Sequence, residues 1–167
     1  GEVLLFLPWL FGERAPVADP RVRAAFVNLT LSHGRQHLLR AIYEGVGFNL
    51  RWIFDAVAAG GVPCASVRAV GGGARSDLWL QTIADISGRR VERVAAPQHA
   101  GAVGCALAAA VAVGAVPRLA AIAERVRVER VFVPDPEPAP VYDALYRSFR
   151  SLHPPLSAAG AAWSAVA

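Results

Sequence analysis

The chain has 167 residues, of which 54% are hydrophobic and 18% charged, so its composition excludes an intrinsically disordered protein and permits one domain with a sizeable core. All 17 basic residues are arginine, which excludes mechanisms that need a lysine, such as a Schiff base or a phosphate-loop lysine. The net charge of +4 is spread along the chain, which favours a solvated surface over nucleic-acid binding. No apolar run is long enough to span a bilayer.

The spacing of apolar residues and chain breakers predicts alternating short strands and helices. The expected strands are Glu2–Leu10, Ala24–Leu29, Val67–Val70, Val91–Val94 and Val128–Val133. The expected helices run from Thr30 or Ser32 to about Ala59, from Ser76 to Gly88, from Gly101 to Val113, from Pro117 to about Val126, and from the proline-rich linker 134–140 to Pro154. This alternation predicts an α/β fold with a mixed sheet flanked by helices.

Three of these helices carry further information. Gly45 and Gly47 weaken the long helix intrinsically, so they indicate a close crossing with another element. The segment Gly101–Val113 is almost entirely alanine, valine and leucine, which predicts the most buried helix of the fold. One face of the last helix is expected to be apolar, with Val141, Leu145, Phe149 and Leu152.

Three consecutive glycines, Gly71–Gly73, separate the strand Val67–Val70 from the helix that opens at Ser76. Glycines at such a place allow positive φ and close approach of a ligand to the backbone. The helix start behind them offers unpaired N–H groups and the positive end of the helix dipole. Ser76 suits the N-cap and Asp77 suits the first turn. The pattern indicates a nucleotide site, and a tight turn without a ligand is the alternative.

The remaining reactive side chains are few. Cys64 and Cys105 are isolated in the sequence, so we expect small core residues in a reducing cytoplasm. His33 and His37 have the spacing of a metal pair on a helix, but a site needs three or four ligands, so we expect polar residues of a helix start. We therefore assign no metal ligand. The chain contains no methionine, and we expect a piece of a longer protein.

Three stretches of the chain form an ordered set of motifs. The first has Phe6-Leu7-Pro8 and Gly12-Glu13-Arg14-Ala15-Pro16; the second has Leu29-Thr30-Leu31-Ser32-His33, His37-Leu38 and Ala41-Ile42-Tyr43-Glu44-Gly45; the third has Gly71-Gly72-Gly73-Ala74-Arg75-Ser76, Gln81, Ala84-Asp85, Gly88 and Pro97-Gln98-His99-Ala100-Gly101-Ala102 with Gly104. In this order and spacing, the three stretches resemble the FGGY carbohydrate kinases, and among them most closely the xylulokinase-like members. The second stretch departs from the family at Asn28, where a glycine is usual; asparagine tolerates unusual backbone angles.

This resemblance implies that residues 1–167 are most of the C-terminal, nucleotide-binding lobe, with a ribonuclease-H-like fold as in the actin and sugar-kinase superfamily. ATP and Mg²⁺ would be the cofactors, and a pentulose such as xylulose, or a related sugar or polyol, the substrate. The N-terminal lobe would be the partner and would hold the catalytic aspartate, so no catalytic residue is assigned to this chain, which alone would be inactive. A homodimer is possible, since the residues leave the oligomeric state undecided. Neither a nucleic acid nor a membrane is expected as a partner.

The resemblance also implies site residues. Gly71, Gly72 and Gly73 would line the adenosine and phosphate region. Ser76 would form a hydrogen bond to the nucleoside, and Asp77 would lie beside Ser76. Gln98 and Gly101 would lie near the adenine, with an ordinary helix start as the equal alternative. Trp79 could stack on adenine or pack in the core.

Two other functions remain open from the residues. Gly71, Gly73 and Ser76 approach the G-x-G-x-x-G fingerprint of dinucleotide-binding proteins, with Glu92 in the next strand. Against this, the sixth position is serine and Glu92 lies inside its strand. A non-catalytic interaction module would instead explain the high apolar share.

Overall fold

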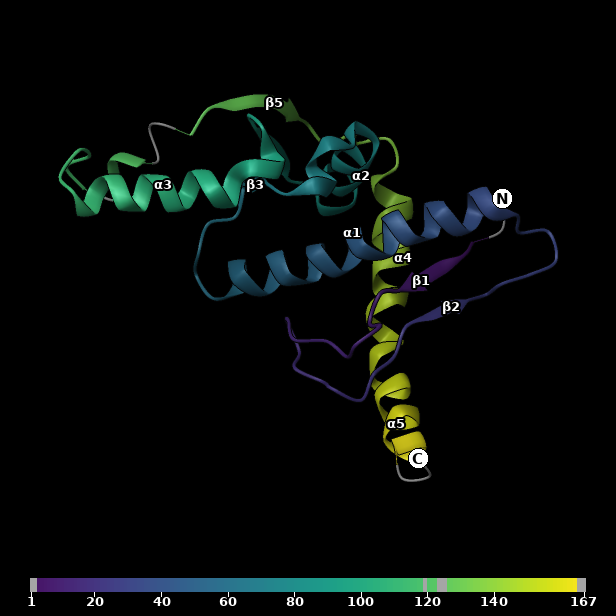
Figure 1. Cartoon of the computed structure of the whole chain (residues 1–167). Helices are drawn as coiled ribbons and strands as arrows, with labels where there is room; N and C mark the ends of the chain where they lie inside the picture. Colours follow the sequence, from purple (N-terminus) through teal and green to yellow (C-terminus); the bar gives the residue numbers. More distant parts are fainter. Residues whose placement is uncertain (1–2, 119, 123–125, 165–167) are drawn as a thin grey trace.

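The computed structural model describes residues 3–118, 120–122 and 126–164, and in them the predicted mixed sheet is confirmed (Figure 1). Strands β3 (Ser66–Ala69) and β4 (Arg90–Val94) are parallel, and β5 (Val128–Phe132) is antiparallel to β4. A separate antiparallel pair joins β1 (Leu5–Leu7) to β2 (Ala25–Val27). Glu2 lies outside the described residues, and within residues 3–10 the first strand is shorter than predicted.

Among the described residues, five α-helices and the 3₁₀ turns η1 and η2 connect and cover these strands. They are α1 (Arg35–Ala59), η1 (Gly72–Arg75), α2 (Asp77–Ser87), η2 (Pro97–His99), α3 (Ala100–Ala112), α4 (Ala139–Ser151) and α5 (His153–Ser164). The helix predicted between Pro117 and Val126 falls partly on residues outside the described ranges. Within those ranges, no helix combines the length and apolarity that a membrane crossing needs.

Helix α1 is crossed at its two glycines, as predicted. A Cβ at Gly45 would lie 2.1 Å from the carbonyl oxygen of Phe6, so β1 passes directly over this position. A Cβ at Gly47 would lie 2.8 Å from Cδ1 of Ile86 on α2. The two glycines therefore let a strand and a helix approach α1 more closely than any side chain would allow.

Two hydrophobic cores meet at α1. One contains Leu5, Leu7, Trp9, Val22, Phe48, Ile86, Tyr142, Tyr146 and Phe149. The other contains Ala74, Leu80, Ile83, Ala84, Val91 and Phe132, and lies between α2 and the three-stranded sheet. Phe48 of α1 belongs to the first core, while Leu50 and Phe54 pack against the second. The long helix is thus the element that both cores share.

The start of α1 differs from the prediction. The helix begins at Arg35 after Gly34, and neither Thr30 nor Ser32 is its cap. The two histidines provide the local hydrogen bonds instead: His33 Nδ1 accepts the N–H of Thr30, and His37 Nδ1 accepts the N–H of Gly34, both at 3.0 Å. Because His33 precedes the helix, the two histidines are not a pair on one helical face.

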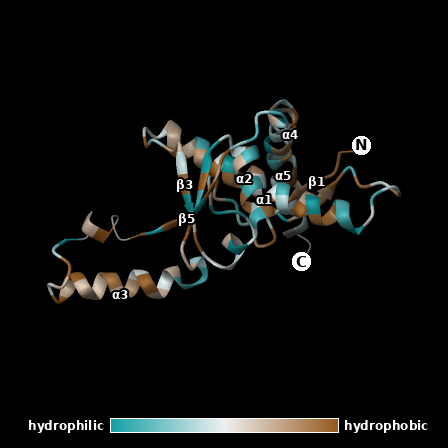
Figure 2. Ribbon diagram, turned by 90° about the horizontal axis from the view of Figure 1, so that it is seen from above, coloured by the Kyte–Doolittle hydropathy of each residue, from teal (hydrophilic) through white to brown (hydrophobic). Residues whose placement is uncertain are grey.

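The prediction that the helix at Gly101–Val113 is the most buried is wrong. No residue of α3 is buried, and the helix projects from the rest of the structure (Figure 1). Figure 2 shows hydrophobic residues along this projecting helix. Cys105, expected in the core, is exposed with it. A helix that is apolar on all sides prefers apolar surroundings, but its sequence does not say which residues will provide them. In the described residues, α3 has apolar neighbours on one side only, around a cavity of about 450 Å³ lined by Val94, Leu107 and Ile122, among others.

The predicted apolar face of the last helix is confirmed except at one residue. Phe149 is buried, Leu145 and Leu152 pack against the first core, and Val141 is 60% exposed. The other buried residues of α4 are Tyr142 and Tyr146. The tyrosines can be buried because their hydroxyl groups are hydrogen-bonded. The Tyr142 hydroxyl accepts from Arg40 and donates to Glu44. The Tyr146 hydroxyl donates to Asp55 at 2.9 Å. Pro154 and Pro155 stand in the first turn of α5 and do not end the helical region, because an N–H is dispensable there.

Asn28 has a φ of +68°, so it adopts the left-handed conformation that favours glycine. Its side-chain amide donates to the carbonyl oxygen of Val3 at 2.7 Å. Asparagine is among the residues that tolerate this region, and the hydrogen bond ties the end of β2 to the N-terminal segment.

We expect Gly45→Ala to lower the free energy of unfolding by about 1–3 kcal/mol or more, because the new methyl group meets the backbone of β1 and overpacks the crossing. Chemical denaturation measures this. The matched control is Gly104→Ala in α3, where a Cβ meets no atom within 4 Å. Equal effects of the two substitutions would contradict the crossing.

We expect Ala108→Asp in α3 to change the stability of this chain by no more than about 0.5 kcal/mol, since the position is exposed. Ala84→Asp in α2 is the matched control, because Ala84 is 0% exposed. That substitution buries an unpaired charge and should cost about 4 kcal/mol or more. Unfolding of the Ala108→Asp chain would show that α3 is covered in solution.

Candidate functional site

The glycine turn is locked to the loop before α3. Gly71 has a φ of +89°, a backbone conformation that only glycine adopts easily. Its N–H donates to the carbonyl oxygen of Pro97 at 2.7 Å, and η1 and η2 lie against each other. The structure thus brings the predicted residues Gly71–Gly73 close to Gln98 in η2 and to the first turn of α3, which contains Gly101.

The three glycines have different roles. A Cβ at Gly71 or Gly72 would meet no atom within 4 Å, so both leave bare backbone facing open space. A Cβ at Gly73 would lie 2.2 Å from the ring of Trp79. Gly73 is therefore required by packing against α2, while Gly71 and Gly72 leave room for a ligand to approach the main chain.

The helix start behind the turn is built as predicted. Ser76 is the N-cap of α2, and its hydroxyl oxygen accepts the N–H of Trp79 at 3.3 Å. The hydroxyl proton remains available for donation to another group. Asp77 follows in the first turn, where a negative charge interacts favourably with the helix dipole.

Asp77 is also the centre of an ion-pair network that the sequence did not reveal. Its carboxylate pairs with Arg93 of β4 at 2.5 Å and with Arg130 of β5. These bonds tie the start of α2 to two strands of the sheet. Asp77 is about half exposed, so each pair is screened by solvent, and the network contributes more to orientation than to stability.

A cavity of about 320 Å³ adjoins η2 and is lined by Arg75, Arg93, Gln98 and Glu129, among others. Sequence reasoning singled out only Gln98 of these. Arg75 could have been found from the sequence, because it follows the three glycines closely. Arg93 and Glu129 could not, because the pairing of β4 with β5 brings them to the cavity. The Nε of Arg93 is buried and has no hydrogen-bond partner in the described part of the chain, although the Glu129 carboxylate lies 3.4 Å away.

Two other candidates are explained by packing. Trp79 stacks on Tyr43 of α1, with ring centroids 5.8 Å apart, so its ring is part of the interface between α1 and α2. His33 and His37 contact each other edge to face at 5.5 Å. No group of three or more histidine, cysteine or acidic side chains comes together within the described ranges.

Comparison with known proteins gives the family. The profile of the C-terminal domain of the FGGY family of carbohydrate kinases matches residues 1–113. The chain is 36% identical over 152 residues to a xylulose kinase of Escherichia coli K12, covering 91% of this chain and 31% of that protein. It is 49% identical over 84 residues to a gluconokinase of Bacillus licheniformis, covering 50% of this chain and 16% of that protein.

Solved structures agree. A ligand-bound xylulose kinase from Lactobacillus acidophilus superimposes with a TM-score of 0.84 at 29% identity, over 96% of this chain and 32% of that one. A xylulose kinase from Rhodospirillum rubrum gives a TM-score of 0.77 at 35% identity, over 94% and 31% of the two chains. The chain thus spans about a third of the proteins that it matches along most of its own length. From its sequence and its fold, the chain belongs to the FGGY family of carbohydrate kinases, as part of their C-terminal domain.

Proposed function

We propose that the protein to which this chain belongs is an ATP-dependent sugar kinase, a transferase that phosphorylates a pentulose such as xylulose or a related sugar or polyol. The names of the relatives support this substrate class, because xylulose kinases match about nine-tenths of the chain. The observation that carries the proposal is the open backbone at Gly71 and Gly72, placed between β3 and the start of α2 and locked to η2.

The residues present fit a nucleotide. Phosphate oxygens would approach the main chain at Gly71 and Gly72, near the positive end of the α2 dipole. The hydroxyl of Ser76 would donate to the nucleoside, with Asp77 beside it. Gln98 and Gly101 would lie near the adenine, across the contact between η1 and η2. When bound, ATP would supply the phosphoryl group for transfer.

The positive charges beside the glycine turn suit an anion. Arg75 at the end of η1 and Arg93 in β4 line the neighbouring cavity. Arg93 is already paired with Asp77 and Glu129, so it mainly holds the start of α2 in place. No ion pair is identified for Arg75 among the described residues, and its guanidinium is the cation that a phosphate could recruit.

The rest of the catalytic machinery would come from the part of the kinase that this chain does not contain. Phosphoryl transfer needs a base for the sugar hydroxyl and usually Mg²⁺ to neutralise the phosphates. The described residues hold no cluster suited to a metal, so they do not fit Mg²⁺ by themselves. We propose that the N-terminal lobe provides these groups, that the apolar face of α3 packs against other parts of the kinase, and that the enzyme is cytoplasmic.

The dinucleotide alternative is disfavoured by the position of Glu92. Its carboxylate accepts the Ser66 hydroxyl at 2.9 Å and pairs with Arg68 at 3.5 Å on neighbouring β3. An acidic residue that recognises a ribose would instead stand free at the end of its strand. Separate titrations with ATP and NADH distinguish the two proposals, because only a dinucleotide-binding protein would prefer NADH.

In the complete enzyme, we expect Gly72→Val to weaken ATP binding by about tenfold or more while sugar binding changes little, because the side chain occupies space that the phosphates need. Calorimetric titration with each ligand measures both effects. Equal losses for ATP and the sugar would mean that the turn is only structural.

Gly73→Ala is the contrasting variant, because its methyl group meets Trp79 and not the open space. We expect it to lower the melting temperature, while Gly72→Val leaves the melting temperature nearly unchanged. A melting temperature lowered equally by both would remove the distinction drawn between these glycines.

We expect residues 1–167 alone to transfer no phosphate to any sugar, because the reaction requires the nucleophile, base, metal and phosphate to be held together. A coupled ADP-release assay with a panel of pentuloses and polyols tests this. Sugar-dependent turnover of about 1–100 per second would show that a residue interpreted above as structural is the catalytic base.

A further inference from the structure

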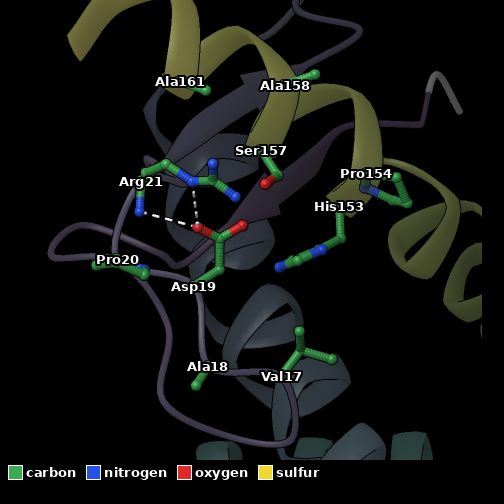
Figure 3. A pocket seen from close by; sticks show the side chains of 10 residues that line it. All are labelled: Val17, Ala18, Asp19, Pro20, Arg21, His153, Pro154, Ser157, Ala158 and Ala161. Carbon is green, nitrogen blue, oxygen red and sulfur yellow. Dashed lines mark hydrogen bonds and ion pairs between the residues drawn. The ribbon is translucent and has the colours of Figure 1, made fainter.

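A further cavity lies where α5 meets the loop that follows Pro16. These two segments are at the end of the structure opposite to β3 and α2 (Figure 1). The volume of the cavity is about 670 Å³, within the range of pockets that hold small molecules. Figure 3 shows side chains from the loop and from α5 facing each other across it. None of the residues that line it belongs to the nucleotide site proposed above.

Both walls of this cavity are held in place. On the loop side, the backbone of Asp19 pairs with that of Glu13 through two hydrogen bonds of 2.8 Å. On the helix side, a Cβ at Gly160 would lie 2.2 Å from the carbonyl oxygen of Arg21, so α5 touches the loop backbone. This close packing makes the cavity a defined feature of the fold.

A buried carboxylate lies at the centre. Asp19 is only 5% exposed, and its Oδ1 accepts the backbone N–H of Arg21 at 2.9 Å and the Nε–H of the same residue at 3.5 Å. The Ser157 hydroxyl, followed by the Arg21 backbone N–H, lowers the pKa of Asp19 to about 2. The carboxylate is therefore charged at neutral pH, and the Arg21 guanidinium balances it.

A buried imidazole faces the carboxylate without a partner of its own. His153 is 7% exposed, and its Nε2 makes no hydrogen bond to any described residue. Its ring is fixed edge-on against Trp9 and Trp52, with centroids 5.1 and 5.5 Å away. Figure 3 shows the imidazole extending from the start of α5 toward Asp19. An unbonded polar atom in a buried position is costly, so a bound group there would be favoured.

We propose that this cavity is a binding site for a small neutral polyol. A hydroxyl group both donates and accepts, so one ligand can donate to Asp19, to His153 or to the oxygen of Ser157, and can accept from Arg21. Its C–H groups would pack on apolar lining residues such as Val17 and Ala161. An anion would be repelled by Asp19, and a cation would compete with Arg21 for the same carboxylate. This proposal does not depend on the kinase function.

Three compounds test the charge selection, because sorbitol, gluconate and glucamine share one hydroxylated carbon chain and differ at one end. We expect the 167-residue chain to bind sorbitol saturably in calorimetry, and to bind gluconate and glucamine about tenfold more weakly or not at all. The ¹⁵N signal of His153 Nε2 should move with sorbitol, and ADP should not compete. Thermal shift is unsuitable, because polyols stabilise proteins without binding.

Two variants locate the site. His153→Phe keeps an aromatic ring against the tryptophans but removes Nε2, and it also assigns the NMR signal. Ser157→Ala removes the hydroxyl beside Asp19. Each should weaken sorbitol binding by about tenfold, whereas Ser148→Ala, on the exposed side of α4, should leave it unchanged. If the His153→Phe variant does not fold, the effect of Ser157→Ala on sorbitol binding tests the location of the site.

The proposal is wrong if sorbitol gives neither saturable heat nor a shift of the His153 signal. Equal affinity for gluconate or glucamine would overturn the neutral-ligand assignment. Unchanged sorbitol binding in the folded variants would show that the compound binds elsewhere on the chain.

Discussion

The close approach of β1 and α2 to the long helix α1 is the constraint on which the rest of the structure depends. Both contacts need a residue without a side chain, and Gly45 and Gly47 provide them two positions apart. Each glycine weakens the helix itself by roughly 1 kcal/mol relative to alanine. The burial of Leu7, Phe48 and Ile86 around these crossings offsets that cost. A locally poor helix is thus stabilised by the tertiary contacts that its glycines permit.

The candidate nucleotide site follows from this packing. Because α2 lies between α1 and the sheet, its first turn comes to rest beside η1, where Gly71 and Gly72 leave open backbone. Trp79 holds one side of this arrangement by stacking on Tyr43, and Asp77 holds the other through Arg93 and Arg130. The site is therefore supported by groups that need not touch a ligand, as a precisely oriented binding site requires.

Local chemistry made much of this predictable. The cap at Ser76, the turn at Gly71 and the existence of the strands each depend on a few neighbouring residues, and the structure confirms them. Even the tight crossings at Gly45 and Gly47 could be inferred, because glycine inside a helix is unfavourable without a compensating contact. The ordered set of such signals also carried the resemblance to the FGGY kinases.

The sequence by itself determined the order and type of most elements, the glycine turn and the family, since these are set by neighbouring residues. Only the tertiary structure decided that α3 is exposed, that Trp79 stacks on Tyr43, and that Arg93 reaches Asp77. It alone placed His153 opposite Asp19. These pairings join residues far apart in the chain, and hydrophobic periodicity states which surroundings a side chain prefers without stating which residues will supply them.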